Sequence, residues 1–478
     1  AAMAEEGALC VKFLHLTDHE TWSKATLLVQ AVALDCESGT CSGAKELIPR
    51  VQEARSSSNT LRGLTWAIEK VKAAGICEEQ ELCGKVFGFL AKLATGLPEL
   101  FPDGIPMLVQ HKSDQVTLTR RQCAALHAAS VFNLLPSTRH QCQRASRQMD
   151  LPSFDLGHVM DKEPHKMLCL VAYFVQVAHA GEAYLNERVS FQRRCQNVSL
   201  DWARLDEPLC AASVREGCIE DSEGNLQADF ANEYLGGGAL QGGNVQEEIR
   251  FAACPECYVG MLFCECMLEN EAIFIVGTQQ YSRYSGYGDE FRFATPRMVE
   301  RERPGQLDRH GRWGPTITAF DALQHPGIGQ FSASLINREL LKAYVACLGD
   351  FEDNSRGMGF ATGNWGCGVF GGEPQLKSLV QWVAASAAKR PEMLYFPFGD
   401  ARVDQLEEVI EALKGKTCAQ ASPAPTSRAR RSRAGMSGRP TCRSCRSPIP
   451  RGRSGGDGCS AIRELTSART ISSSSSRG

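Results

Sequence analysis

No run of about 18 or more uncharged apolar residues occurs in this 478-residue sequence, so it lacks the stretch that a membrane-spanning helix requires. The N-terminal segment AAMAEEGALC carries acids where a secretory signal would carry bases before an apolar core. We therefore expect a soluble protein that is not secreted and does not bind membranes. A hydrophobic fraction of 43% is enough to fill the cores of two or three domains.

Two nucleotide-binding signatures are also missing. Neither glycine-rich loop of the sequence is followed by the Gly-Lys-Ser/Thr of a P-loop, and neither gives G-x-G-x-x-G after the first strand of a β-α-β unit. These absences disfavour P-loop enzymes. They leave an NAD-using or nucleotide-sugar enzyme on a doubly wound fold as a minor alternative.

A regular disulfide pattern is absent as well. The 21 cysteines are odd in number and irregularly spaced in a long chain, which favours reduced thiols over a disulfide scaffold. The pairs Cys254/Cys257 and Cys264/Cys266 stand too close together for a zinc ribbon, and a third pair is Cys442/Cys445. We therefore expect no metal site.

The charge is unevenly distributed. Residues 419–478 contain twelve arginines and two acids, so a segment of net charge +10 follows 418 residues of net charge −13. An acidic body disfavours direct, counterion-driven binding of nucleic acid. The basic tail is the one segment that could make such contacts, and a nuclear import signal or a solvated tail are equally good interpretations of it.

The pattern of apolar residues changes along the chain. Segments in 1–196, such as HETWSKATLLVQAVALDC and HKMLCLVAYFVQVAHAG, have the helical period and predict a helical accessory region. In 197–417, β-like runs such as LQADFA and EAIFIVGT alternate with helical runs, which predicts an α/β domain with ligand loops at the strand ends. Residues 418–478 are rich in Arg, Ser and Pro and are predicted to be disordered.

The most informative segment is QADFANEYLGGGALQGGNVQEEIRF, residues 227–251. Its glycines can adopt φ > 0 and expose backbone N–H groups, as a phosphate cradle requires. A second glycine-rich loop, ATGNWGCGVFGGE at 361–373, precedes a helical run whose N-terminus would favour an anion. Two such loops fit a diphosphate, although each loop alone could be a flexible turn.

Glu247 and Glu248 follow the first loop where a helix is predicted to begin. Adjacent helical residues point in different directions, so the two acids do not form the spaced pair of an ordinary glycosidase. One acid can hold a substrate while the other moves a proton. The alternative is that both acids simply complement the helix dipole.

The sequence resembles the poly(ADP-ribose) glycohydrolases, whose signature is a GGG loop followed by QEE. Here that signature is GGGALQGGNVQEE, and the match continues through DFAN, GTQQYSRYSGY, TGNWGCGVFGG and YFPFGD in the same order. A weaker match to the helical region of the eukaryotic members extends back through VTLTRRQCAALHAASVFNLLP. The resemblance covers about residues 100–400 and implies a macrodomain-like mixed sheet flanked by helices.

The resemblance also implies roles for individual residues. Glu248 is expected to protonate the departing ribose oxygen and then activate water, and Glu247 to hydrogen-bond the scissile ribose, with Asp229 beside them. The residues expected to bind substrate are Ile219 and Glu220 at adenine, Asn232 and Gln246 at the ribose, Gly236, Gly237 and Gly238 in the first loop, Asn364, Trp365, Gly366, Cys367, Gly368, Val369 and Phe370 in the second, and Tyr287 and Phe398 at the adenosine end.

The expected activity is hydrolysis of the ribose–ribose bonds of poly(ADP-ribose), with ADP-ribose as product and ADP-ribosylated proteins as partners. A carboxylate would stabilise the oxocarbenium-like state, so the scheme needs no metal and no cofactor. The expected location is the nucleus, the cytoplasm or both. The alternative from another class is a macrodomain that binds ADP-ribose without cutting it, which would need the glycine loops but not the acids.

Overall fold

Helices fill the first part of the chain, as the apolar spacing predicts. The computed structural model describes residues 9–56, 59–135, 151–197, 200–299, 307–351, 355 and 357–423. The helices of this part are α1 (Leu14–Thr17), α2 (His19–Glu37), α3 (Ala44–Arg55), α4 (Arg62–Lys70), α5 (Glu79–Glu81), the π-helix η1 (Leu82–Val86), α6 (Phe87–Thr95), α7 (Leu97–Leu100), α8 (Arg120–Val131), α10 (Gly157–Lys162), α11 (Pro164–Ala178) and α12 (Glu182–Leu185).

Local sequence explains where these helices begin. The side chain of Asp18 accepts a hydrogen bond from the Thr21 N–H at the start of α2. The side chains of Thr119 and Gln122 form a reciprocal capping box at the start of α8. Among the described residues, no helix combines the length and the apolarity that a bilayer crossing requires.

Eight strands form one mixed sheet in the order β3-β4-β7-β10-β6-β11-β12-β5. They are β3 (Asp114–Thr119), β4 (Arg188–Cys195), β5 (Ala211–Val214), β6 (Leu226–Asp229), β7 (Glu271–Val276), β10 (Thr316–Ala319), β11 (Phe360–Gly363) and β12 (Glu392–Phe396). The strands from β10 to β5 run parallel, and β3, β4 and β7 pair antiparallel. Two short pairs stand apart: β1 (Cys10–Val11) with β2 (Ile105–Pro106), and β8 (Ser282–Ser285) with β9 (Arg292–Pro296).

Helices cover both faces of this sheet. On β7, Ile273 and Ile275 belong to the apolar core shared with the N-terminal helices, while Ala272 and Phe274 belong to a second core. All six residues of β7 are buried, as expected for a strand covered on both sides. The macrodomain-like mixed sheet flanked by helices, with helices preceding it, is therefore confirmed.

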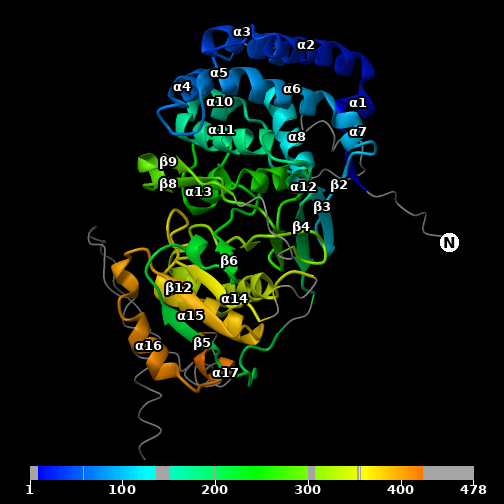
Figure 1. Cartoon of the computed structure of the whole chain (residues 1–478). Coiled ribbons are helices and arrows are strands. Elements are labelled where there is room, and N and C mark those ends of the chain that lie inside the picture. The colour runs from blue at the N-terminus through cyan, green and yellow to red at the C-terminus, as the bar shows by residue number, and fades with distance from the viewer. Residues whose placement is uncertain are drawn as a thin grey trace, which may run out of the picture. The chain divides into compact units, whose positions relative to one another are not determined.

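The remaining helices lie between and after the strands of the second half of the chain. They are α13 (Gln246–Ala253), α14 (Ala333–Cys347), α15 (Pro374–Ala387), α16 (Leu406–Leu413) and α17 (Cys418–Ala421), with the 3-10 helices η3 (Ile219–Asp221), η4 (Pro255–Leu262), η5 (Gly288–Glu290), η6 (Gly327–Phe331) and η7 (Ala401–Val403). Helix α11 contacts α13 and β9 (Figure 1). Helix α14 packs on α15 and β7.

Two features were not expected from the apolar pattern. Strands β3 and β4 lie within the segment predicted to be helical, yet they extend the sheet beyond β7. Helix α17 lies at the start of the predicted tail, and Cys418 is fully buried against the second core. The predicted domain limits stay a prediction, and residues 424–478, with Cys442 and Cys445, lie outside the described residues.

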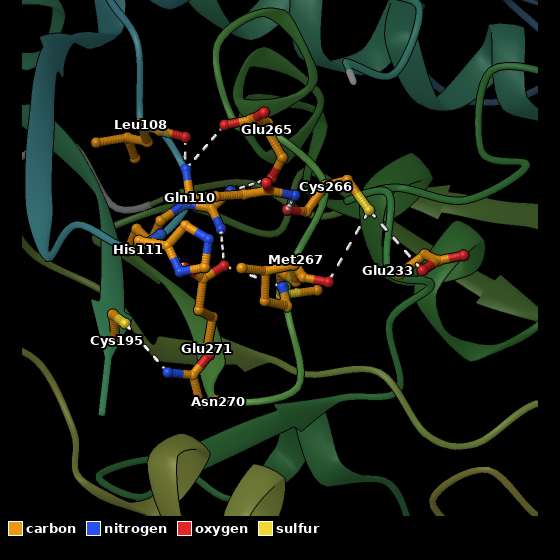
Figure 2. A network of polar contacts seen from close by, with 12 residues as sticks. Leu108, Gln110, His111, Cys195, Glu233, Glu265, Cys266, Met267, Asn270 and Glu271 are labelled. Atoms are coloured by element: carbon orange, nitrogen blue, oxygen red, sulfur yellow. Dashed lines mark hydrogen bonds and ion pairs between the residues drawn. The ribbon is translucent and has the colours of Figure 1, made fainter. Parts of the chain in front are cut away.

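A polar network joins the segment of Leu108 and Gln110 to the segments around Glu265 and Glu233 (Figure 2). The Gln110 N–H donates to Glu265 Oε2 over 2.8 Å, and the Glu265 N–H donates to the Leu108 carbonyl over 3.1 Å. The neighbouring Met267 N–H donates to the Glu233 carbonyl over 2.8 Å. Because Glu233 directly follows Asn232, this network holds the entrance to the loop in place.

Candidate functional site

The site lies at one edge of the parallel strands. Ala319 of β10 pairs with Asp229 of β6, and Gly363 of β11 pairs with Phe396 of β12, so the carboxyl ends of these strands are level. The loops that leave β6, β11 and β12 therefore start side by side. Such an edge is where open α/β sheets bind ligands.

Two acids bind opposite parts of the first loop. Helix α13 begins at Gln246, so Glu247 and Glu248 stand in its first turn, as predicted. Glu247 Oε2 accepts from the Asn232 N–H over 2.9 Å, and its Oε1 accepts from the Gly236 N–H over 2.6 Å. Only 2% of Glu247 is exposed. Both of its oxygens are thus occupied by backbone donors.

Glu248 holds the later part of the same loop. Its Oε1 accepts from the Gly238 N–H over 3.1 Å, and its Oε2 accepts from the Val245 N–H over 2.9 Å, as the third helical residue does in a capping box. Glu248 is 7% exposed, more than Glu247 or the fully buried Asp229. The two adjacent acids therefore face different parts of the loop.

Glycine is required where the loop meets these acids. Gly237 has φ +47°, and a Cβ there would lie 2.9 Å from Glu247 Oε2 and 3.0 Å from Glu248 Oε1. A Cβ on Gly243 would lie 2.9 Å from Glu248 Oε1. The bare backbone is what allows the loop to enclose two carboxyl groups.

The acids create a pocket that favours bound protons. Burial raises the pKa of Asp229 to about 8, with the charges of Glu248 and Glu220 acting in the same direction against Arg250. Burial and the charges of Asp229 and Glu248 hold the pKa of Glu247 well above its usual range. Within the described residues, neither carboxyl oxygen of Asp229 has a hydrogen-bond partner. The pocket can therefore store protons near neutral pH.

Polar side chains fix the turn between β6 and α13. Gln246 Oε1 accepts from the Phe230 N–H over 2.8 Å, and its Nε2 donates to the Ala228 carbonyl over 3.1 Å. Asn232 Oδ1 accepts from the Tyr234 N–H over 3.0 Å. Gln246 thus joins the end of β6 to the start of α13, which sets the position of the acids.

The second loop is anchored differently. Asn364 accepts from the Tyr395 hydroxyl over 2.8 Å and donates to the Pro397 carbonyl over 2.7 Å. Trp365 is fully buried and donates from its ring to the Phe320 carbonyl over 3.0 Å, and the Cys367 side chain is also buried. Trp365 and Cys367 can therefore face a ligand mainly with their backbone.

Helix α15 begins at Pro374, directly after this loop, as the sequence predicts. Gly366 has φ +72°, and a Cβ there would lie 2.4 Å from Ala322. Val369 is 67% exposed, next to the open Gly368 and the partly buried Phe370. The loop thus presents Gly368 to Phe370 outward, while its base is packed tightly.

The two predicted aromatic residues meet. The rings of Tyr287 and Phe398 lie 5.8 Å apart at an angle of 50°, and both are exposed. The Gly288 N–H donates to the Asn244 carbonyl over 2.8 Å, which ties the Tyr287 segment to the first loop. Phe398 follows Pro397, which is tied to the second loop through Asn364. This aromatic pair therefore stands where the two loops meet.

Ile219 and Glu220 lie in η3, where Ile219 is buried. Glu220 Oε1 lies 3.8 Å from Arg250 Nη1, and Arg250 Nη2 donates to Gln227 Oε1 over 2.5 Å. Sequence reasoning missed Arg250. A basic residue in the buried turn of a helix directly after the acids is the signal that could have identified it.

Lys166 of α11 is the second residue that sequence reasoning missed. It is 1% exposed, and its ammonium donates to three carbonyl oxygens of the first loop. The sequence places it in a helical run that is otherwise apolar, KMLCLVAYFVQVA, where a buried charge needs a specific partner.

The structure thus brings the acids, the two glycine loops and the aromatic pair to one strand edge, and Glu220 of η3 is linked to α13 through Arg250. The roles of all the predicted residues stay predictions. Within the described residues, no three His, Cys, Asp or Glu side chains are arranged to hold a metal ion.

Comparison with known proteins assigns the two parts of the chain. Residues 199–405 match a family model described as poly(ADP-ribose) glycohydrolase, macro domain fold, and residues 76–193 match the helical domain of the same family. A probable poly(ADP-ribose) glycohydrolase 2 of Arabidopsis thaliana is 30% identical over 399 residues, which cover 70% of this chain and 75% of the relative.

Two further relatives are similar over comparable lengths. Poly(ADP-ribose) glycohydrolase 1 of Arabidopsis thaliana is 32% identical over 384 residues, 64% of this chain and 68% of the relative. Poly(ADP-ribose) glycohydrolase 2 of Caenorhabditis elegans is 37% identical over 353 residues, 70% of this chain and 67% of the relative.

Proposed function

This chain belongs to the poly(ADP-ribose) glycohydrolase family, and from this premise we propose that Glu248 is the acid and base of the reaction. The activity is hydrolysis of the ribose–ribose bonds of poly(ADP-ribose), which releases ADP-ribose. The alternative of a macrodomain that only binds ADP-ribose is disfavoured, because the relatives across both matched regions are named as glycohydrolases.

One observation carries the assignment of Glu248. Both acids touch the first loop, but Glu247 is held by the Asn232 and Gly236 N–H groups beside buried Asp229, whereas Glu248 is the more accessible of the three. A proton donor must reach the leaving oxygen, so the more accessible acid suits this role. Glu247 suits the role of holding the ribose, with Asp229, Asn232 and Gln246 shaping the same pocket.

The reaction then follows in two steps. As the bond between the anomeric carbon and the leaving ribose oxygen breaks, the Glu248 carboxyl gives its proton to that oxygen, and its carboxylate stabilises the oxocarbenium-like state. A water molecule then adds to the anomeric carbon and gives a proton back to Glu248. One water is consumed for each ADP-ribose released, and Glu248 ends as it began.

The two glycine loops are proposed to bind the ADP-ribose unit and take no part in proton transfer themselves. The N–H groups of Gly236 to Gly238 already donate to Glu247, Tyr234 and Glu248, so the first loop is suited to bind the diphosphate through its later N–H groups. The second loop is suited to bind it through the N–H groups around Gly368 to Phe370, together with the N-terminus of α15. The exposed rings of Tyr287 and Phe398 are suited to the adenosine end, and Ile219 and Glu220 to adenine.

Glu248→Gln tests the assignment with labelled polymer. Loss of a required acid and base lowers the rate about 10²- to 10⁴-fold, and the amide retains the size of the side chain, so calorimetric binding of ADP-ribose should remain. Glu233→Gln, a change of a neighbouring acid outside the pair, is the control. Turnover by Glu248→Gln at the wild-type rate would remove Glu248 from the mechanism.

The natural partners of the enzyme are proposed to be ADP-ribosylated proteins that carry the polymer, in the nucleus, the cytoplasm or both. Residues 424–478, the larger part of the predicted basic tail, lie outside the described residues, so the role of the tail in nuclear import stays a prediction. Imaging of the tagged protein with and without residues 424–478 would test it: import that does not change on removal would contradict this role.

A further inference from the structure

Lys166 is a buried cation that contacts the first loop from the helical part of the chain. It lies in the first turn of α11, and its Nζ donates to the carbonyls of Ala239, Gln241 and Gly243 over 2.9, 2.8 and 2.5 Å. An ammonium group has three protons. All three can be used on carbonyls of a single loop.

This contact sets the direction of three peptide units. In a trans peptide the N–H points opposite to the carbonyl of the same unit. Carbonyls that point at Lys166 therefore direct the N–H groups of Leu240, Gly242 and Asn244 away from it. None of these three N–H groups donates a hydrogen bond to another described residue. They are the kind of donors that bind an anion at a loop.

Lys166 is also part of the electrostatics of the acids. Burial lowers its pKa to about 8, whereas the charges of Glu163, Glu248 and Cys169 act to raise it. Glu163, which precedes α11, also approaches the loop: a Cβ on Gly242 would lie 3.8 Å from its Oε1. The ammonium thus stands between the helical region and the acid that the mechanism uses.

We propose that Lys166 is a positioning residue of the active site, which holds the first loop so that its free N–H groups meet the diphosphate and its Gly238 N–H meets Glu248. The inference rests on the proposed function. It makes the helical region part of the binding machinery, because α11 supplies the side chain on which the loop is arranged.

A purely structural lysine would behave differently, and Lys342 of α14 offers the comparison. Lys342 is fully buried, donates to the Leu268 carbonyl over 2.6 Å and forms an ion pair with Asp321. It is as buried as Lys166, but its partners are a carboxylate and the Leu268 carbonyl, and it does not contact the first loop. Replacing either lysine with methionine removes the charge and keeps the length of the side chain.

The test compares Lys166→Met and Lys342→Met for folding, for ADP-ribose affinity by calorimetry, and for kcat and KM on polymer. We expect Lys166→Met to weaken ADP-ribose binding and to lower kcat by about 10-fold or more each, since several aligned donors are lost. Lys342→Met should lower the unfolding temperature but leave the ADP-ribose affinity and kcat within about 3-fold of the wild type.

Lys166→Arg adds a graded variant that keeps the charge. Its planar guanidinium fits three separate carbonyls less well than an ammonium, so its affinity for ADP-ribose should lie between those of the wild type and Lys166→Met. If Lys166→Met does not fold, a deficit of about 3-fold or more in Lys166→Arg carries the test.

Two results would overturn the role of Lys166: wild-type affinity and kcat in the folded variants, or an equal loss in Lys342→Met. Glu248→Gln separates this failure from that of the proposed function. It should abolish turnover and retain ADP-ribose binding, whereas Lys166→Met should reduce both.

Discussion

The acids beside the two glycine loops differ in whether a cation pairs with them. At the first loop, Asp229, Glu247 and Glu248 are buried together, and the described residues place no cation within ion-pair distance of any of them. Beneath the second loop, each acid has a cation: Glu339 pairs with Lys377 and with Arg338, and Asp321 also pairs with Arg338.

This difference in ion pairing suggests different roles for the two loops. A buried carboxylate paired with a cation is fixed in place, whereas burial without a cation raises the pKa of Asp229 and of Glu247, so these two acids can retain protons. The Lys377 ammonium also lies 3.9 Å from the centre of the Trp365 ring, which supports the second loop from below. Under the proposed mechanism, the acids at the first loop therefore combine substrate binding with proton transfer, while the second loop serves as a rigid platform.

Adding one methyl group to each loop is the strongest test of this comparison. Gly237→Ala places a Cβ against both Glu247 and Glu248 at φ +47°, so we expect kcat to fall about 10- to 100-fold, as a strain of ~1–3 kcal/mol at the acids would produce. Gly366→Ala should instead lower the unfolding temperature and the ADP-ribose affinity, because its Cβ would meet Ala322.

Gly181→Ala is the control for these substitutions, because a Cβ there meets no atom within 4 Å and the backbone is extended. Steady-state kinetics on polymer and heat unfolding give the readouts. A larger fall in kcat for Gly366→Ala than for Gly237→Ala would contradict the division between the loops.

Asp229, which is buried without a cation, should also reduce the stability of the folded protein in a pH-dependent way. The pKa of Asp229 is about 8 in the folded protein, against an ordinary value of 3.8, so between these pH values the folded state keeps a proton that the unfolded state loses. Stability contributed by this group is therefore lost as the pH rises across that window. Asp229→Asn should stabilise the protein little near pH 4 and by up to a few kcal/mol near pH 8, because each tenfold change in proton affinity is worth about 1.4 kcal/mol.

Heat unfolding of the wild type and Asp229→Asn between pH 4 and pH 8 measures this difference. Glu407→Gln, a change of an exposed acid on α16, is the control and should give a flat difference. A gain for Asp229→Asn that shrinks as the pH rises would show that the acid is not held protonated.

Local pattern was enough to predict much of this site. The acids stand in the first turn of α13 and the second loop leads into α15, because glycine, proline and helical spacing act over a few residues. The motifs of the resemblance then indicated Tyr287 and Phe398, whose contact joins segments that are 111 positions apart in the sequence.

Long-range pairing accounts for what the pattern missed. Strand β4, RVSFQRRC, carries polar residues on a segment that becomes a strand because its neighbours β3 and β7 pair with it. Lys166 and Arg250 resembled ordinary helix residues, because their partners are carbonyls and side chains of distant loops. No local spacing reveals such partners.

The aromatic pair where the two loops meet gives the smallest effect. Phe398 is 69% exposed and has φ +53°, so Phe398→Gly removes a ring that packs at a tilt against Tyr287 and also relieves the strain of the backbone. We expect KM for polymer to rise about 3- to 10-fold, the value of one stacking contact, with kcat little changed. Phe398→Ala should raise KM equally but be less stable than Phe398→Gly, because alanine retains the strain of a positive φ.

Leu27→Ala, at a similarly exposed site on α2, is the control and should change neither KM nor kcat. A fall in kcat as large as that in Gly237→Ala would mean that the ring pair acts on the acids, and the two loops would then no longer be separable.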